Sequence, residues 1–127
     1  NRVPRISKLT ENLIKDITGK DKIENMSTIG IIEKCIFPMV NEALLILEEG
    51  MAQRPSDIDV VWLNGYGFPK DKGGLLFWAN KLGSSKILEG LKKMIDEGLE
   101  IKISQMLADM VKKNKNIFDT EDQKIRV

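Results

Sequence analysis

The chain contains no histidine, and it has a single cysteine, Cys35, among its 127 residues. Without imidazole, neither a Ser-His-Asp nor a Cys-His catalytic centre can form within the chain, and zinc sites that need histidine are excluded too. One cysteine can form neither an internal disulfide nor a thiolate-rich metal site. We therefore expect no catalytic residue and no metal ligand in this chain taken by itself.

A strong excess of one charge is also missing, because 20 basic residues are matched by 19 acidic ones. This balance gives no general attraction to nucleic acid or to an anionic membrane surface. No apolar run approaches the length of about 18 residues that a membrane-spanning helix needs. We expect neither a nucleic-acid nor a membrane partner. The composition leaves the compartment open among peroxisome, mitochondrion and cytoplasm, all of them intracellular.

The chain lacks a complete nucleotide-binding motif. It has no Walker-A pattern, and the nearest approach to a dinucleotide fingerprint is Gly65-Tyr66-Gly67. Lys70 stands where the third glycine of that fingerprint is needed, and no β-branched run precedes the motif as a buried strand would. We therefore expect the chain to bind no cofactor of its own.

The chain is well supplied with apolar residues at helical spacing. Apolar residues make up 42% of the sequence, enough for the core of one domain. No segment reads as a strand and no internal repeat is evident. The fold class predicted is all-α, a single domain of five or six helices. We divide the chain into a lead-in segment with a short helix over 1–26, a helical domain over 27–118 and a frayed tail over 119–127.

The apolar spacing predicts helices over 9–17, 27–49, 56–65, 74–82, 85–97 and 99–111, with Ile117 and Phe118 folding back onto the last of them. The helix over 27–49 has an apolar face about half a circumference wide, which is typical of a central helix with several neighbours. Pro38 within it predicts a kink or the true start of the helix. Cys35 lies on the apolar face, so we expect it to be buried.

The third of these helices has a clear start. Ser56 is predicted to cap it, and Asp59, three residues on, to reach back as in a capping box. Asp57 and Asp59 also suit the positive end of the helix dipole. Ser84 or Ser85 is predicted to cap the helix that follows Gly83.

Several short motifs occur in a fixed order. They are Asn41-Glu42-Ala43, Glu48-Glu49-Gly50, Asp57-Ile58-Asp59, Asn64-Gly65-Tyr66-Gly67-Phe68-Pro69 and Gly73-Gly74. Together they resemble the C-terminal helical domain of 3-hydroxyacyl-CoA dehydrogenase, above all the second copy that ends multifunctional fatty-acid β-oxidation enzymes. The similarity is densest over 32–83.

The resemblance implies that cofactor binding and catalysis belong to other domains. In this family an N-terminal Rossmann domain binds NAD and carries a His/Glu catalytic pair, and the first helical copy contributes an Asn-Arg pair shortly before a proline. If Pro38 and Glu42 match the family's landmarks, Glu33-Lys34 occupies the Asn-Arg position. The resemblance therefore implies the second copy, a structural and dimerisation domain that is inactive alone. Its implied partners are the Rossmann and sister helical domains, with acyl-CoA substrate met indirectly and NAD bound elsewhere in the full-length enzyme.

Two sets of residues carry these expectations. The family-motif residues, which we expect to be structural, are Asn41, Glu42, Asp57, Asp59, Gly65, Gly67, Phe68, Pro69, Gly73 and Gly74. The residues expected at a partner or homodimer interface are Tyr66, Phe68 and Phe77.

Two other functions are open at this stage. One is a non-enzymatic helical interaction module that reuses the fold. The other is a self-standing acyl-CoA binder, suggested by Lys70 and Lys72 beside a cluster of aromatic residues. Glu33 and Glu42 also qualify as an acid/base pair, but they are nine residues or about 13 Å apart along a helix, and a solvated face is favoured.

Overall fold

The computed structural model describes residues 5–19 and 26–120 of the chain. Within these ranges the chain forms six α-helices, two short 3-10 helices and no strand. The helices are α1 (Lys8–Thr18), α2 (Thr28–Glu48), α3 (Pro55–Gly65), α4 (Leu75–Leu82), α5 (Ser84–Asp96) and α6 (Gln105–Lys113), with 3-10 turns η1 (Lys70–Lys72) and η2 (Ile117–Thr120). The predicted all-α fold is confirmed. Parts of the predicted lead-in and tail, 1–4, 20–25 and 121–127, lie outside the described residues.

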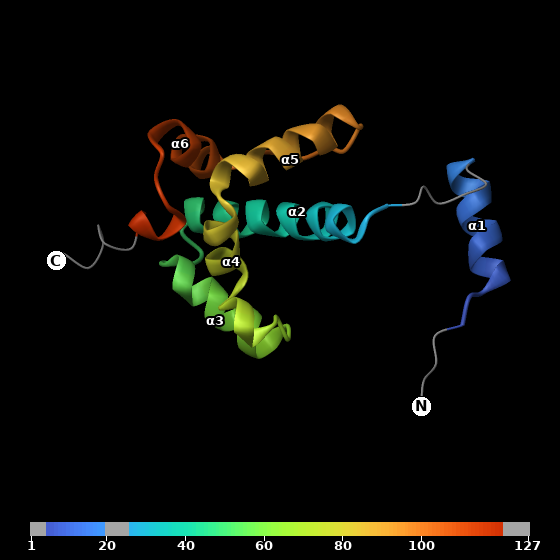
Figure 1. The fold of residues 1–127 in the computed structure, drawn as a ribbon, viewed down its shortest axis with the longest axis horizontal. Coiled ribbons are helices and arrows are strands. Elements are labelled where there is room, and N and C mark those ends of the chain that lie inside the picture. The colour runs from blue at the N-terminus through green and yellow to red at the C-terminus, as the bar shows by residue number, and fades with distance from the viewer. Residues whose placement is uncertain (1–4, 20–25, 121–127) are drawn as a thin grey trace.

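Helix α2 runs through the middle of the molecule (Figure 1). It packs against α4, α5 and α6, as its wide apolar face predicted. It begins where Ser27 accepts a hydrogen bond from the Gly30 N–H at 3.0 Å. The helix continues through Pro38, so of the two predicted alternatives, a kink or the true start of the helix, the second is wrong. None of the described helices is both long and apolar enough to cross a membrane.

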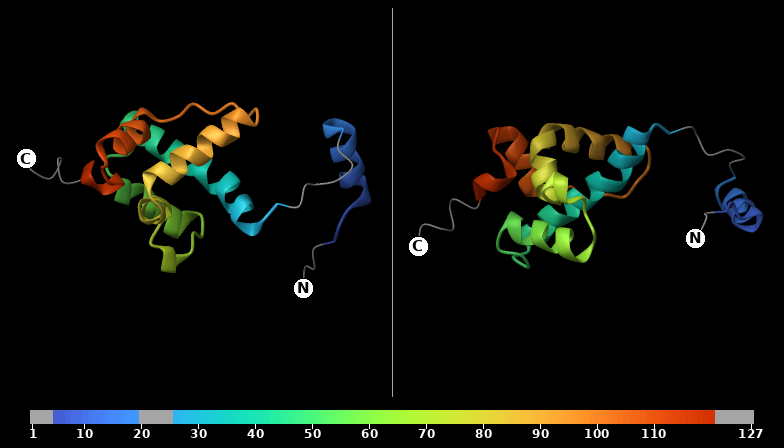
Figure 2. Two further views of the ribbon diagram at one scale, coloured as in Figure 1. Left: turned by 45° about the horizontal axis from the view of Figure 1, so that its top comes forward. Right: turned by 60° about the horizontal axis from the view of Figure 1, so that its bottom comes forward.

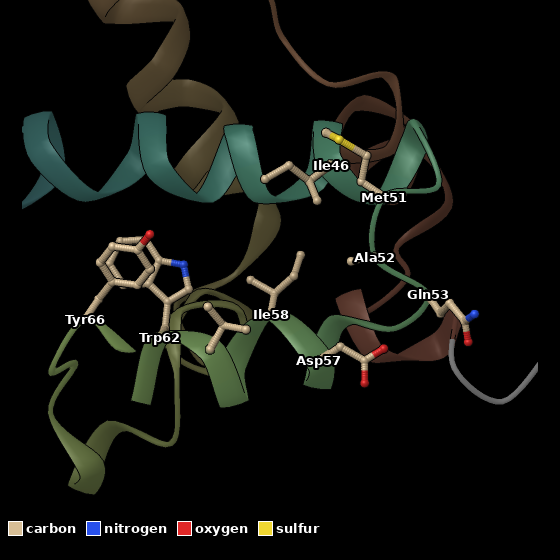
Figure 3. A pocket seen from close by; sticks show the side chains of 9 residues that line it. Ile46, Met51, Ala52, Gln53, Asp57, Ile58, Trp62 and Tyr66 are labelled. Atoms are coloured by element: carbon tan, nitrogen blue, oxygen red, sulfur yellow. The ribbon is translucent and has the colours of Figure 1, made fainter. Parts of the chain in front are cut away.

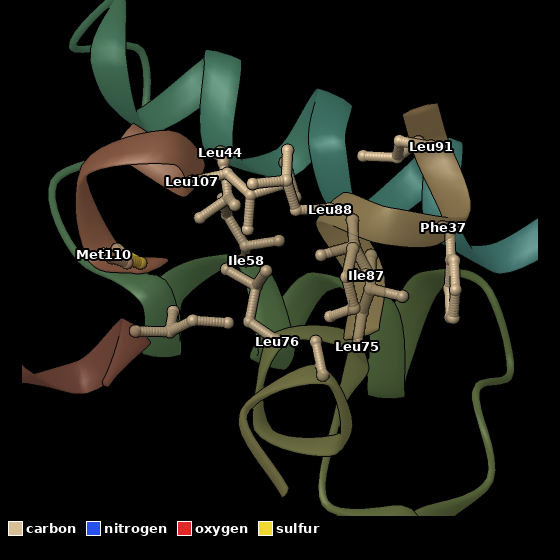
Figure 4. Packing of buried hydrophobic residues seen from close by; sticks show 14 of the residues in the cluster. Phe37, Leu44, Ile58, Leu75, Leu76, Ile87, Leu88, Leu91, Leu107 and Met110 are labelled. Atoms are coloured by element: carbon tan, nitrogen blue, oxygen red, sulfur yellow. The ribbon is translucent and has the colours of Figure 1, made fainter. Parts of the chain in front are cut away.

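The hydrophobic core lies between α2, α4 and α5 and is closed by α3, α6 and η2 (Figure 4). Its fully buried members include Phe37 and Leu44 from α2, Leu76 from α4, Leu91 from α5 and Ile117 from η2. Ile117 also donates its N–H to the Asn80 side chain at 2.9 Å. The segment after α6 therefore packs mainly on α4, whereas the prediction placed it on the last helix.

The segment before α6 is not helical, although its apolar spacing predicted a helix from Leu99 onward. Residues 99–104 are irregular, and α6 begins only after Ser104, whose hydroxyl accepts a hydrogen bond from the Leu107 N–H at 3.1 Å. The side chain of Asn41 bonds the carbonyl of Lys102 and the N–H of Ser104. These backbone groups are held by another helix, so a tertiary contact overrides the local helical pattern.

Two predicted helix caps are also wrong. Helix α3 begins at Pro55, because proline at the first helical position has a preset φ and lacks only an N–H that would be unpaired there. Arg54 becomes the N-cap, and Asp57 rather than Asp59 reaches back to it, accepting the Arg54 N–H at 3.1 Å. Helix α5 begins after Gly83 with no side-chain cap from a serine.

Cys35 is exposed, so the prediction that it is buried is wrong as well. The apolar part of the α2 surface is wider than the part that neighbouring helices cover, and Cys35 lies on the uncovered side. Helix α1 forms where predicted and ends at Thr18, with Gly19 as its C-cap, yet it buries none of its residues. It lies apart from the other five helices in the views of Figures 1 and 2.

Candidate functional site

An apolar groove of about 540 Å³ lies between the end of α2 and helix α3 (Figure 3). It is lined by Ile46, Met51, Ala52, Gln53, Asp57, Ile58, Val61, Trp62 and Tyr66. Seven of these nine side chains are hydrophobic or aromatic, and Asp57 is the only charged one. A concave apolar surface with few polar groups is typical of a ligand or partner site.

The aromatic wall of the groove is built by the turn that follows α3. Trp62 lies with its ring centroid 5.2 Å from that of Tyr66 and 6.0 Å from that of Phe68. The Tyr66 and Phe68 N–H groups both donate to the Trp62 carbonyl, at 3.3 and 3.1 Å. Gly67, with φ of +67°, allows the chain to reverse between them. The glycine-aromatic motif thus ends the helix and stacks its rings. The side chain of Tyr66 is 72% exposed, whereas Phe68 is half-buried.

One charged side chain, Asp57, lines the groove, and it is paired with a cation. The Arg54 guanidinium donates a hydrogen bond to Asp57 Oδ1 at 2.7 Å, and this bond holds the pKa of the Asp57 carboxyl below its usual value. Asp57 is therefore a carboxylate at neutral pH. None of the lining residues is basic. The groove can accept an apolar group, and the one cation known beside it, Arg54, is paired with Asp57.

The second aspartate of the Asp-Ile-Asp motif has a different role. Asp59 is buried, and its two carboxylate oxygens accept the N–H groups of Leu76 and Phe77 at 2.7 and 3.0 Å. These are among the first N–H groups of α4, which have no partner within the helix. Asp59 therefore caps α4 from α3 and ties the two helices together.

The two adjacent glycines make room for this cap. A Cβ on Gly74 would lie 2.4 Å from Asp59 Cγ, and one on Gly73 would lie 2.5 Å from the Phe77 ring. Both glycines also have positive φ, +77° and +114° in chain order. Side chains are excluded at both positions by contact as well as by backbone conformation.

Asn41 and Glu48 form a second tie, from α2 to the start of α6. Asn41 is buried; it donates to the Lys102 carbonyl at 2.8 Å and accepts from the Ser104 N–H at 2.9 Å. Glu48 Oε1 accepts from the Ser104 hydroxyl at 2.5 Å and from the Met106 N–H at 2.6 Å. Sequence reasoning missed Ser104. The seven-residue spacing of Asn41 and Glu48, two helical turns on one face, is the signal that could have indicated a shared partner.

The remaining predicted residues lie in several places. Glu42 is exposed on α2, Gly65 ends α3, and Pro69 precedes η1. Phe77 is 39% exposed, with the Lys81 ammonium 4.6 Å above its ring. Lys72 pairs with Asp71 at 3.0 Å.

The structure does not bring the two candidate acid/base carboxylates together. Glu33 pairs with Lys86 at 3.2 Å, whereas Glu42 points to solvent. Over residues 5–19 and 26–120 there is no group of three or more His, Cys, Asp or Glu side chains that could hold a metal ion.

The chain is similar in sequence to a known family of protein domains. The family model described as "3-hydroxyacyl-CoA dehydrogenase, C-terminal domain" matches residues 31–123. The human peroxisomal bifunctional enzyme is 45% identical over 71 residues, 56% of this chain and 10% of that protein. The guinea-pig (Cavia porcellus) peroxisomal bifunctional enzyme is 37% identical over 92 residues, 72% of this chain and 12% of its own length.

A plant relative, the peroxisomal fatty acid beta-oxidation multifunctional protein MFP2 of Arabidopsis thaliana, is 38% identical over 90 residues, 69% of this chain and 12% of that protein. The chain thus spans about a tenth of the length of the relatives it matches.

Proposed function

Since this chain belongs to the 3-hydroxyacyl-CoA dehydrogenase C-terminal domain family, we propose that it is a structural and dimerisation domain of an NAD-dependent enzyme of fatty-acid β-oxidation. In that enzyme, 3-hydroxyacyl-CoA is oxidised to 3-ketoacyl-CoA by residues outside this chain. The chain supplies packing surface for a Rossmann domain and a sister helical domain. It binds neither NAD nor a metal, and it meets the acyl-CoA only indirectly.

The observation that carries this proposal is that the polar side chains of the motifs form hydrogen bonds within the fold. Asn41, Glu48 and Asp59 each bond backbone groups of another part of the fold. Among the described residues, no buried side-chain nitrogen or oxygen lacks a hydrogen-bond partner. A general acid or base must instead keep a proton or a lone pair available for its substrate. The chain as a whole also has no histidine to act as one.

The same geometry does not favour a self-standing acyl-CoA binder. The groove beside α3 is apolar, and its one charged lining residue is the Asp57 carboxylate, which is paired with Arg54 and can donate nothing to a phosphate. Lys72, one of the two lysines that suggested such a site, pairs with Asp71. CoA recognition needs cations or helix N-termini directed at its phosphates.

The dimerisation part of the proposal rests on Tyr66, Phe68 and Phe77. Tyr66 is largely exposed beside the apolar groove, and Phe77 is partly exposed at the start of α4. Aromatic side chains at the rim of a concave apolar surface are typical anchors of protein interfaces. A closed two-fold dimer is the commonest assembly of such surfaces.

Two assays on the purified chain test the proposal. Mixed with NADH and a 3-ketoacyl-CoA, the chain should oxidise no NADH. In velocity sedimentation at high micromolar concentration it should contain dimer. Turnover would refute the structural role, whereas a clean monomer would refute only the dimerisation part.

A further inference from the structure

The N-terminal half of α2 has two unlike sides. On the side facing α5, Glu33 pairs with Lys86 at 3.2 Å and Lys34 pairs with Glu97 at 2.7 Å, flanking the buried ring of Phe37. These charged residues, which a sequence reading assigns to solvent, are therefore engaged with the rest of the domain.

The opposite side of α2 is apolar and uncovered. We call it the outer face and define it as Ile31, Ile32, Cys35 and Met39. The two isoleucines are 50% and 43% exposed, Met39 is 40% exposed, and the Cys35 thiol is exposed too. Leaving one such residue in water is normal, but four on one side of a helix indicate a surface that another element covers.

Helix α1 likewise has an apolar face that no other element covers. Its apolar face consists of Leu9, Leu13, Ile14 and Ile17, which lie within an arc of about 140° at 100° per residue. All four are exposed, from 45% at Ile14 to 83% at Ile17. A helix of 11 residues is marginal in water by itself, and most helical stability in proteins comes from packing an amphipathic face.

We propose that α1 folds back antiparallel along α2, with its apolar face on the outer face of α2, and so buries Cys35. In each set the first and last apolar residues are eight residues apart, a rise of about 12 Å along the helix. In an antiparallel hairpin the residue numbers rise along one helix and fall along the other. Leu9 would therefore lie beside Met39, Leu13 beside Cys35 and Ile17 beside Ile31.

Chain connectivity selects α1 as the occupant in preference to a second copy. Residues 19–27 separate the two helices, a length that spans at most about 33 Å from Thr18 to Thr28, against an interaxial distance of 8–10 Å for packed helices. The tether keeps α1 at an effective concentration in the millimolar range beside α2, which a second molecule does not reach at micromolar protein. This inference is independent of the enzyme to which the domain belongs.

The single cysteine provides a direct test on the full chain. The assay is the reaction of Cys35 with a chromogenic aromatic disulfide. The double variant Leu13→Asp/Ile17→Asp places two charges on the apolar face of α1, and Cys35 should react about tenfold more slowly in the native chain than in this variant. A tenfold difference corresponds to about 1.4 kcal/mol of docking free energy. The control Asn12→Asp/Thr18→Asp adds the same charge outside that face and should react as slowly as the native chain. Equal rates in all three proteins would overturn the proposal.

A second experiment reports the geometry. The variant Leu13→Cys should form an intramolecular disulfide with Cys35 under mild oxidation, seen as a faster band on a non-reducing gel, whereas Lys15→Cys, on the opposite side of α1, should not. Covalent dimers formed in proportion to concentration, without the intramolecular band, would assign the outer face to a second copy and refute folding back. Equal cross-linking of both variants would refute it too, because it would mean that α1 has no preferred side.

Discussion

Replacing Gly74 by alanine tests the link between α3 and α4 most severely. The new Cβ would lie 2.4 Å from Asp59 Cγ, well inside van der Waals contact, and Gly74 has a φ of +114° that alanine adopts only under strain. The backbone strain costs about 1–3 kcal/mol. The displaced Asp59 carboxylate would also weaken its bonds to the Leu76 and Phe77 N–H groups. Hydrogen bonds to a charged group contribute about 1.5–3 kcal/mol each.

Together these terms predict that Gly74→Ala lowers the free energy of unfolding by about 3–5 kcal/mol. For a domain of this size that is a fall in Tm of at least about 12 °C. Gly67→Ala is the matched control, since Gly67 also has positive φ, at +67°, but a Cβ there meets nothing within 4 Å. The control should cost about 1–2 kcal/mol.

Urea titration followed by circular dichroism measures both variants. If Gly74→Ala is no less stable than Gly67→Ala, the close contact with Asp59 does not hold α4 in place, and the reasoning is refuted.

Three further predictions concern other parts of the structure. Asn41→Ala should destabilise the domain by about 2–4 kcal/mol in urea titration, because it leaves the Lys102 carbonyl and the Ser104 N–H without their partner; a change below 1 kcal/mol would mean that water or a shifted loop replaces the amide. The Arg54 hydrogen bond lowers the Asp57 pKa and the Lys34 hydrogen bond lowers the Glu97 pKa, relative to ordinary values of 3.8 and 4.5. A lowered native pKa gives stability that is present above the unfolded value and is lost as pH falls through the native one. Unfolding free energy should therefore fall as pH is lowered below about 4.5, and the double variant Asp57→Asn/Glu97→Gln should flatten this slope; an unchanged slope would contradict the assignment. Tyr66→Asp should favour monomer in sedimentation, because a dimer contact would bury an unpaired charge, whereas an undiminished dimer would remove Tyr66 from the interface.

Much of the helical organisation could be predicted because it depends on local patterns. The apolar spacing and the glycines located α1, α2, α4 and α5 to within about two residues. Local signals failed where a distant residue decides the conformation. Residues 99–104 have helical spacing, but Asn41, about 60 residues earlier, binds their backbone at Lys102.

Of the nine residues that line the groove, the sequence singled out only Asp57 and Tyr66, and it did not predict the connections of the motif residues. The sequence singled out Asp57, Asp59 and Gly74, yet it assigned the capping box to the wrong aspartate. Helix α3 begins at Pro55, one residue before Ser56, so the third helical position is Asp57. Asp57 therefore bonds the N-cap, whereas Asp59 faces α4. Asp59 finds its partners because α4 packs beside α3, and no local sequence pattern indicates where α4 packs.

The burial of Cys35 could not be judged from periodicity, for a similar reason. A wide apolar face on α2 indicates several neighbours, but not which part of the face each neighbour covers. In the structure, α5 lies over the Glu33 and Lys34 side and leaves the Cys35 side open. The contacts between α2 and α5 join residues more than 50 positions apart, so no local pattern indicates which side α5 covers.

The most direct test of the central claim, that this domain is structural and performs no chemistry, is a calorimetric titration of the purified chain with NADH. We predict no heat beyond dilution, because the chain has no histidine and its dinucleotide fingerprint lacks the third glycine. Saturable binding of one NADH per chain at micromolar concentration would contradict the account.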